Sequence, residues 1–253
     1  MRISTAVTVL ALALASPALA ANSVLYAPTQ NPPELISASP WNWNFSALNG
    51  GTQAAGTTGT VLNTSATNAS QAGFNISNGG SYNNALMPTL SAAAGYDIRF
   101  TVAVTAETHT GNVDRAGFSI IAIPGDTTKA IELGFHTNEI FSQNDSFVGR
   151  AEQVNFDTTG LTTYDLIVLG STYTLKTGST TLLTGNLHTY NGNANPINNA
   201  IYSQTNWIFL GDDTTSAAGT SEITHVEILP VPEPSSLALL GLAGFALFRR
   251  RRP

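Results

Sequence analysis

Two pairs of adjacent residues carry the oxygen-bearing side chains that calcium prefers. Asp212 and Asp213 follow the apolar stretch 207–210, and Asn144 and Asp145 form a second pair. Ca²⁺ takes about six to eight oxygen ligands, largely from Asp, Asn and carbonyl groups, which suggests the hypothesis that Asp212 or Asp213 helps to hold a Ca²⁺ ion. We favour the simpler interpretation of a turn, in which Asp and Asn side chains bond to their own backbone. We therefore predict no cofactor, with Ca²⁺ as the alternative.

A second predicted site would bind a ligand through one aromatic ring and nearby polar groups, the usual lining of a small-molecule site. Tyr190 lies in the polar segment 189–193, and we expect its ring to stack on a sugar. Glu139, Asn144 and Asp145 are predicted to supply the polar contacts of this ligand-binding site.

The histidines show no metal-binding spacing, such as two histidines separated by one or three residues. Glu107 and His109 are two residues apart, as are His225 and Glu227, so each pair would share one face of a strand. A Gly-x-Ser-x-Gly nucleophile motif is absent from the sequence. We therefore interpret the histidines as surface or partly buried residues. The four are His109, His136, His188 and His225.

The N-terminal end has the three parts of a secretory signal peptide. Arg2 provides the positive start, residues 6–15 are apolar and small, and Ala18-Leu19-Ala20 is an Ala-x-Ala cleavage site. The apolar run is shorter than the roughly 20 residues that a membrane span needs. We predict a signal helix over residues 1–20 with cleavage after Ala20 or the next residue; the alternative is a buried N-terminal helix.

The C-terminal end, residues 231–253, combines Pro232, Glu233 and Pro234 with an apolar stretch at 237–248 and four arginines at 249–252. This order resembles the PEP-CTERM sorting signal of exopolysaccharide-producing Gram-negative bacteria. The resemblance implies that an exosortase-type membrane protease recognises Pro232, Glu233 and Pro234 and cuts nearby.

The same resemblance implies a location. The apolar stretch would form a short hydrophobic helix that anchors the unprocessed chain transiently in the inner membrane, with the arginines on the cytoplasmic side. Cleavage would leave an exported protein at the cell surface or in the extracellular matrix, with no other membrane contact. A plain C-terminal membrane anchor is the alternative.

The charge and cysteine content exclude several classes of protein. The 253 residues include no cysteine, which excludes disulfides and Cys-ligated metals. Residues 21–230, here called the body, hold fifteen acidic and five basic residues, so their formal net charge is −10. A chain without a basic patch is not expected to bind nucleic acid.

The body shows the alternation of apolar and polar residues that is typical of β-strands. Short strands between Gly, Asn, Ser and Thr breaks predict an all-β fold, an antiparallel β-sandwich or jelly roll, with a β-helix as the alternative. In residues 22–96, where Glu34 is the only charged residue, we expect short strands in polar loops rather than a disordered spacer. The clearest predicted strands are 97–105, 117–123, 130–135, 164–168, 207–210 and 223–229, and 173–183 reads as a hairpin.

The order of motifs in the body resembles the choice-of-anchor domains, closest to type Y, that precede PEP-CTERM tails. More broadly, it is similar to the concanavalin A-like lectin/glucanase jelly roll. The narrower resemblance covers roughly residues 85–229. It is carried by segments 114–121, 130–135, 139–145, 156–159, 164–166 and 208–217.

Glycoside hydrolysis would require two carboxylates facing one cleft, about 5 to 10 Å apart. Jelly-roll glucanases place them two residues apart on one strand, and the corresponding strand here carries Glu132 followed by Gly134. Glu139 is seven residues away from Glu132, with the opposite parity. The pair is absent as written, so we expect no catalysis.

We therefore expect an exported structural or carbohydrate-interacting protein, with exopolysaccharide as a partner. An unusual or degenerate glycoside hydrolase or lyase and a protein-binding adhesion module are the alternatives. A structure that buries Glu132 or turns it away from an open groove would disfavour the hydrolase.

Overall fold

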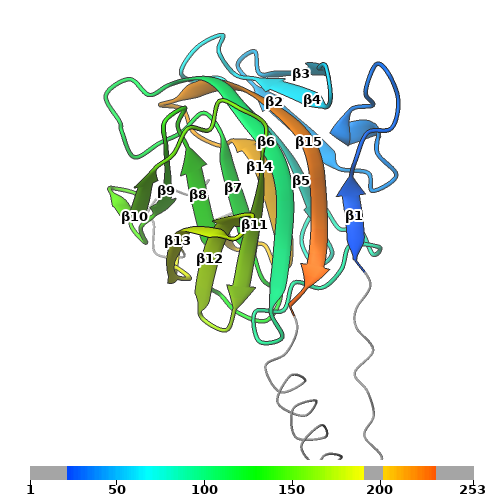
Figure 1. The fold of residues 1–253 in the computed structure, drawn as a ribbon, viewed down its shortest axis with the longest axis vertical. Coiled ribbons are helices and arrows are strands. Elements are labelled where there is room, and N and C mark those ends of the chain that lie inside the picture. The colour runs from blue at the N-terminus through cyan, green and yellow to red at the C-terminus, as the bar shows by residue number, and fades with distance from the viewer. Residues whose placement is uncertain (1–21, 191–201, 232–253) are drawn as a thin grey trace, which may run out of the picture.

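The computed structural model describes residues 22–190 and 202–231, which form two antiparallel sheets packed face to face (Figure 1). One sheet has eight strands in the order β13-β12-β11-β6-β15-β4-β3, with β1 also paired to β15. The other has seven strands in the order β10-β9-β8-β7-β14-β5-β2. The predicted all-β sandwich is therefore confirmed, and the β-helix alternative is wrong.

The eight-stranded sheet consists of β1 (Ser23–Tyr26), β3 (Thr52–Ala55), β4 (Thr60–Asn63), β6 (Tyr96–Thr108), β11 (Thr162–Leu169), β12 (Thr172–Thr177), β13 (Thr180–Asn186) and β15 (Ala218–Pro230). The seven-stranded sheet consists of β2 (Asn44–Leu48), β5 (Gln71–Ser77), β7 (Ser119–Ile123), β8 (Ile131–Phe135), β9 (Glu139–Gln143), β10 (Arg150–Asn155) and β14 (Trp207–Asp212). A 3-10 helix, η1, covers Ile36–Ala38.

The alternating pattern in the sequence produces the core between the sheets. On β6 every second residue is fully buried, from Ile98 through Phe100 and Val102, because successive strand residues point to opposite faces. Phe100 stacks on Tyr164 of β11, with ring centroids 5.3 Å apart, and meets Phe135 of β8 edge-on at 5.9 Å. The contact between Phe100 and Phe135 joins the two sheets.

Residues 22–96 are built into both sheets. β4 pairs with β15 in one sheet, and β5 pairs with β14 in the other. Phe74 and Ile76 of β5 are buried in the core. The prediction of short strands in this polar region is confirmed.

The first and last described strands place both ends of the body at one end of the sandwich (Figure 1). Ser23 of β1 lies opposite Ile228 of β15, while Tyr96 at the start of β6 pairs with Pro230. At the other end of the sandwich, Thr108 of β6 pairs with Ala218. The predicted signal helix and C-terminal hydrophobic helix lie outside the described residues. Within the described part of the chain, no helix combines the length and apolar character needed to cross a membrane.

Candidate functional site

The outer face of the seven-stranded sheet is covered rather than solvated. Ile121 of β7 and Trp207 of β14 point away from the inter-sheet core, yet they belong to a second buried apolar cluster. Phe147, Tyr190 and Tyr202 close over this face, and the rings of Tyr190 and Tyr202 lie 4.7 Å apart. The outer face of this sheet thus carries a second, smaller hydrophobic core.

Glu132 of β8 lies beneath these tyrosines and is 1% exposed. The Tyr202 hydroxyl donates a hydrogen bond to its carboxylate. The hydroxyl of Tyr190 accepts a hydrogen bond from the backbone N–H of Glu132 at 3.2 Å and donates one to the carbonyl of Gln143 at 3.1 Å. Glu132 is therefore held inside the protein rather than presented to solvent.

Burial raises the pKa of Glu132, and the nearby carboxylate of Asp213 raises it further, while Arg115 opposes the shift. Burial likewise raises the pKa of Asp213 against the lowering effect of Arg115. Two carboxyl groups that share one cation in a low-dielectric site cannot both ionise freely. Glu132 and Asp213 are here called the acid pair.

The carboxylate of Asp212 has different neighbours from that of Asp213. Its carboxylate accepts a hydrogen bond from the Thr64 hydroxyl at 2.6 Å and one from the Thr214 N–H at 3.0 Å. The second bond is the local side-chain-to-backbone bond of an Asx turn. Burial raises the pKa of Asp212 to about 8. The structure thus places Asp212 in the turn arrangement, and its role in binding Ca²⁺ stays a prediction, as does that of Asp213.

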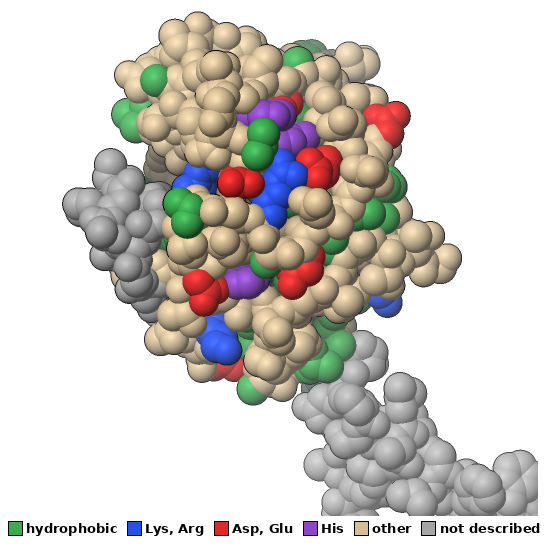
Figure 2. All heavy atoms as spheres, turned by 90° about the vertical axis from the view of Figure 1, so that its left-hand side faces the viewer, with side chains coloured by type: hydrophobic (Ala, Val, Ile, Leu, Met, Phe, Trp, Pro, Cys, Tyr) green, Lys and Arg blue, Asp and Glu red, His purple; other side chains and the backbone are tan. Residues whose placement is uncertain are grey.

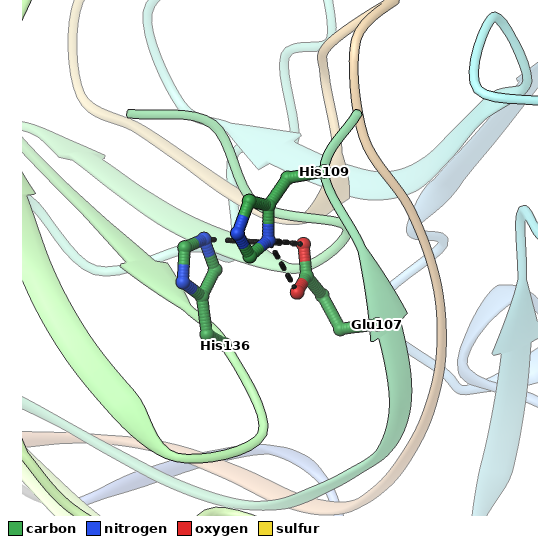
Figure 3. Close-up of side chains that lie close together, drawn as sticks. All are labelled: Glu107, His109 and His136. Atoms are coloured by element: carbon green, nitrogen blue, oxygen red, sulfur yellow. Dashed lines mark hydrogen bonds and ion pairs between the residues drawn. The ribbon is translucent and has the colours of Figure 1, made fainter. Parts of the chain in front are cut away.

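A cluster of histidines and a carboxylate lies at the end of the sandwich opposite the termini. Glu107 is near the end of β6, His109 follows that strand, and His136 follows β8 (Figure 3). Glu107 accepts a hydrogen bond from Nδ1 of His109 at 2.9 Å, and one of its oxygens lies 3.9 Å from Nε2 of His136. The two imidazole rings are parallel, with centroids 4.0 Å apart. We call these three residues the histidine cluster.

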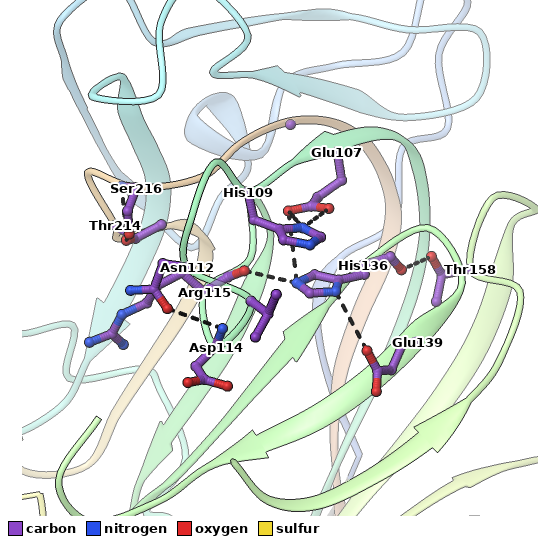
Figure 4. Close-up of polar contacts among 12 residues, drawn as sticks. Glu107, His109, Asn112, Asp114, Arg115, His136, Glu139, Thr158, Thr214 and Ser216 are labelled. Carbon is purple, nitrogen blue, oxygen red and sulfur yellow. Dashed lines mark hydrogen bonds and ion pairs between the residues drawn. The ribbon is translucent and has the colours of Figure 1, made fainter. Parts of the chain in front are cut away.

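Contacts to both ring nitrogens and to the backbone carbonyl fix the position of His136. Its Nε2 lies 2.8 Å from the carbonyl oxygen of Arg115, and its own carbonyl accepts a bond from the Thr158 hydroxyl at 2.6 Å (Figure 4). Its Nδ1 lies 3.7 Å from a carboxylate oxygen of Glu139. Burial lowers the pKa of His136, which favours the neutral ring, the form that can ligate a metal.

Charged side chains continue from the histidine cluster along the same face. Arg150 forms an ion pair with Glu139 at 2.6 Å, and its guanidinium lies 4.2 Å from the centre of the Phe141 ring. Figure 2 shows histidine, acidic and basic side chains gathered on this side, among surface that is mostly uncharged. In the described residues, the one convergent group of three metal-ligating side chains is the histidine cluster, with ligand atoms within 4.8 Å of one another.

The structure divides the predicted ligand-binding residues into two groups. Tyr190 is 1% exposed, so its ring packs on Phe147 and Tyr202 instead of facing solvent. Asp145 bonds His188 at 2.6 Å, and the His188 ring lies 5.8 Å from that of Tyr190. Tyr190, His188 and Asp145 are therefore neighbours.

The other two predicted residues have different surroundings. Glu139 lies with the histidine cluster, where it contacts Arg150 and His136. The side-chain oxygen of Asn144 accepts a bond from the Ser146 N–H at 3.1 Å, as in a turn. Binding by Tyr190, Glu139, Asn144 and Asp145 stays a prediction. The predicted processing residues Ala20, Pro232, Glu233 and Pro234 lie outside the described residues.

The sequence analysis did not place His136 together with Glu107 and His109. The shared strand face of Glu107 and His109 was a correct signal, because the two side chains bond to each other. His136 is 27 residues further on, and only the sheet topology brings the end of β8 to the end of β6. The one indication in the sequence was that His136 directly follows the predicted strand 130–135.

Comparisons with known proteins support both the tail and the fold. Residues 230–252 match the model of the PEP-CTERM protein-sorting motif. A search of the curated proteins found no match. Among solved structures, a carbohydrate esterase from Shiga toxin-encoding bacteriophage phi24B is similar, with a TM-score of 0.53 and 12% identity over 84% of this chain and 100% of that one.

Two further structures are more distant. The Ca²⁺-bound exoplasmic/lumenal domain of VIP36 has a TM-score of 0.46 and 12% identity over 83% of this chain and 91% of that one. The alginate lyase A1-II′ of polysaccharide lyase family 7 has a TM-score of 0.37 and 9% identity over 64% of this chain and 81% of that one.

The sorting motif marks the protein for export and surface sorting in a Gram-negative bacterium, with processing by an exosortase-type enzyme. The body in front of the motif has the jelly-roll fold. The resemblance to choice-of-anchor domains stays a prediction. The chain is thus an antiparallel β-sandwich that carries a PEP-CTERM sorting motif at residues 230–252.

Proposed function

We propose that the body is a non-catalytic module that interacts with the polysaccharide of the cell surface or extracellular matrix. The observation that carries this proposal is the outer face of the eight-stranded sheet, which presents threonine hydroxyls in register on neighbouring strands. Thr101 of β6 lies opposite Thr163 of β11, with their hydroxyls 2.8 Å apart. Thr174 of β12 lies opposite Thr184 of β13, with their hydroxyls 3.4 Å apart.

These hydroxyls are suited to sugars because a folded sheet holds them at fixed positions in contact with water. Exchanging a hydrogen bond to water for one to a sugar hydroxyl changes the free energy only modestly. Many such exchanges over an extended chain of sugars can add up, since the sites are linked. The face thus supports weak contacts repeated along a polymer.

Arg99 on this face is paired with carboxylates of the two neighbouring strands. Arg99 of β6 bonds Asp165 of β11 at 2.7 Å and lies 4.0 Å from Glu227 of β15. The two carboxylates offset the positive charge of the guanidinium, which weakens its attraction for an anionic ligand. Together with the net charge of −10 on the body, it favours a neutral or weakly charged polysaccharide over a strongly acidic one.

The position of Glu132 supports the non-catalytic part of the proposal. A hydrolytic acid must reach the glycosidic oxygen, and Glu132 is 1% exposed beneath Tyr202. Burial also raises the pKa of the nearby Asp213, against the lowering effect of Arg115.

The test is binding of the exported protein to the exopolysaccharide of its own producer, measured by co-sedimentation. A Thr101→Val/Thr174→Val double variant removes two hydroxyls while keeping the shape of both side chains. We expect its apparent affinity to fall by about tenfold, the equivalent of about 1.4 kcal/mol. The control is Thr128→Val, which removes an exposed hydroxyl from a loop. No binding by the unaltered protein, or equal binding by the double variant, would refute the proposal.

A further inference from the structure

We infer that the histidine cluster, Glu107, His109 and His136, is a binding site for a divalent transition-metal ion of the zinc class. Two imidazoles and one carboxylate are ligands that Zn²⁺ accepts, whereas Ca²⁺ and Mg²⁺ require oxygen ligands almost entirely. This inference concerns the end of the sandwich opposite residues 22 and 231, and it does not depend on polysaccharide binding.

The distances are close to those of a ligated site. One ligand atom from each residue lies within 4.8 Å of the others. Zn²⁺ holds nitrogen and oxygen ligands at about 2.0–2.2 Å, so two ligand atoms of one tetrahedral ion are about 3.4 Å apart. Side-chain rotations that shift these atoms by about 1 Å would therefore close the site around an ion. The three side chains already point toward one another (Figure 3).

The surroundings of His136 include a carboxylate that could support a metal-ligating ring. In this structure Nε2 donates a hydrogen bond to the carbonyl oxygen of Arg115 at 2.8 Å. Ligation through Nε2 would replace that bond and move the ring proton to Nδ1, which lies 3.7 Å from a carboxylate oxygen of Glu139. A carboxylate behind a ligating imidazole fixes the tautomer and ring orientation. Glu139 is itself held by Arg150 at 2.6 Å. Glu139 would thus act as a positioning residue, which is a different role from direct ligand contact.

The three side chains of the cluster differ in their exposure to solvent. The side chains of Glu107 and His136 are 2% and 3% exposed, while that of His109 is 30% exposed. An ion would enter past His109. Three protein ligands around a tetrahedral ion leave the fourth position to water or an exogenous ligand, as in open zinc sites.

The experiment uses the exported protein after removal of metal with EDTA and dialysis. Titration with ZnCl₂ in a calorimeter should give one site per chain, with a dissociation constant in the micromolar range or below. Substitution of Co²⁺ should give the visible absorption of a tetrahedral ion, a signature that a merely structural role of these residues would not produce. CaCl₂ at the same concentrations should give no binding.

The variants separate the site from other histidines. His109→Gln should weaken zinc binding at least tenfold. Because His109 is the most exposed of the three ligands, this variant should fold normally. His136→Ala should do the same, with circular dichroism to confirm folding. The matched control is His225→Gln, because His225 pairs with Glu227 at 3.4 Å over the same two-residue spacing but is not part of a three-ligand group.

Two results would overturn the inference. One is no zinc binding by the unaltered protein. The other is zinc affinity and a cobalt spectrum that persist unchanged in His109→Gln and in His136→Ala. Loss in both variants with full retention in His225→Gln supports it.

Discussion

The ring of Phe141 on β9 covers the α-carbon of Gly134 on β8. The two residues are cross-strand partners, and a β-carbon at position 134 would lie 2.5 Å from the ring of Phe141. Position 134 is where a glucanase-like strand would carry its second carboxylate. Here the space for that side chain is filled by an aromatic ring that also packs under Arg150. The glycine at position 134 is therefore part of a packing arrangement.

Gly134→Ala should destabilise the protein by about 1–3 kcal/mol, the usual cost of overpacking a buried site. Chemical denaturation of the unaltered protein and of the Gly134→Ala variant measures the difference in their free energies of unfolding. Gly160→Ala is the control, because a β-carbon at position 160 meets no atom within 4 Å. Equal stability of the Gly134→Ala and Gly160→Ala variants would contradict the contact.

Tyr202→Phe should lower the free energy of unfolding by about 1–3 kcal/mol, because it leaves the buried carboxyl group of Glu132 without its hydroxyl donor. Thermal unfolding at neutral pH gives the measurement. The same substitution at Tyr82, which is 45% exposed, should have little effect. If both variants unfold alike, Tyr202 does not support Glu132 in solution.

The raised pKa of Asp212 predicts that stability depends on pH. Its pKa is about 8 in the folded protein, against 3.8 as the ordinary value. Between these values the folded state holds a proton that the unfolded state has released, so the free energy of unfolding falls as the pH rises from about 4 to about 8. Asp97, whose pKa burial and Asp165 raise to about 7, acts in the same direction.

Asp212→Asn should remove most of the Asp212 share of this dependence. The asparagine keeps the acceptor for the Thr214 N–H and has no charge to desolvate. Urea unfolding at pH 4.5 and pH 8 should show a smaller difference in the variant, by on the order of 2 kcal/mol. His136, whose pKa is lowered, acts with the opposite sign below its ordinary pKa of 6.5, so the comparison is made between variants at the same two pH values. An unchanged difference would show that Asp212 is ionised throughout.

The sorting motif predicts a processing defect in Glu233→Gln. Intact mass measurement of the unaltered protein from the culture medium and the cell surface should show both ends removed. The variant should be retained in the membrane fraction with its arginine cluster attached. Glu34→Gln, which makes the same change outside the motif, should be processed normally. Normal processing of Glu233→Gln would show that Glu233 is not needed for recognition.

The strands of the body were predictable where one face is buried and the other is wet. The pattern over 97–105 predicted most of β6, and the 173–183 hairpin turns at Gly178, whose φ of +56° lies in the left-handed region. β9 and β10 were not predicted. β9 is buried on both faces apart from Glu139, so its residues do not alternate.

The candidate sites were less predictable because they depend on contacts between distant strands. Tyr190 was expected at a polar loop surface, but Phe147 and Tyr202 cover it. Spacing along the chain could connect Glu107 with His109, but it could not connect either residue with His136. A pattern in sequence reports which face a residue occupies, and it does not report which loop closes over that face.

The pairing of β1 with β15 would determine how the body is oriented while its tail is in a membrane. Residues 22 and 231, where the described body begins and ends, lie at the same end of the sandwich, so a body tethered by its tail would stand with that end toward the bilayer. β6 runs the length of the sandwich with 13 residues, which at about 3.3 Å per residue spans roughly 40 Å. The imidazoles at its far tip would then face outward, where they meet the environment before the rest of the body does.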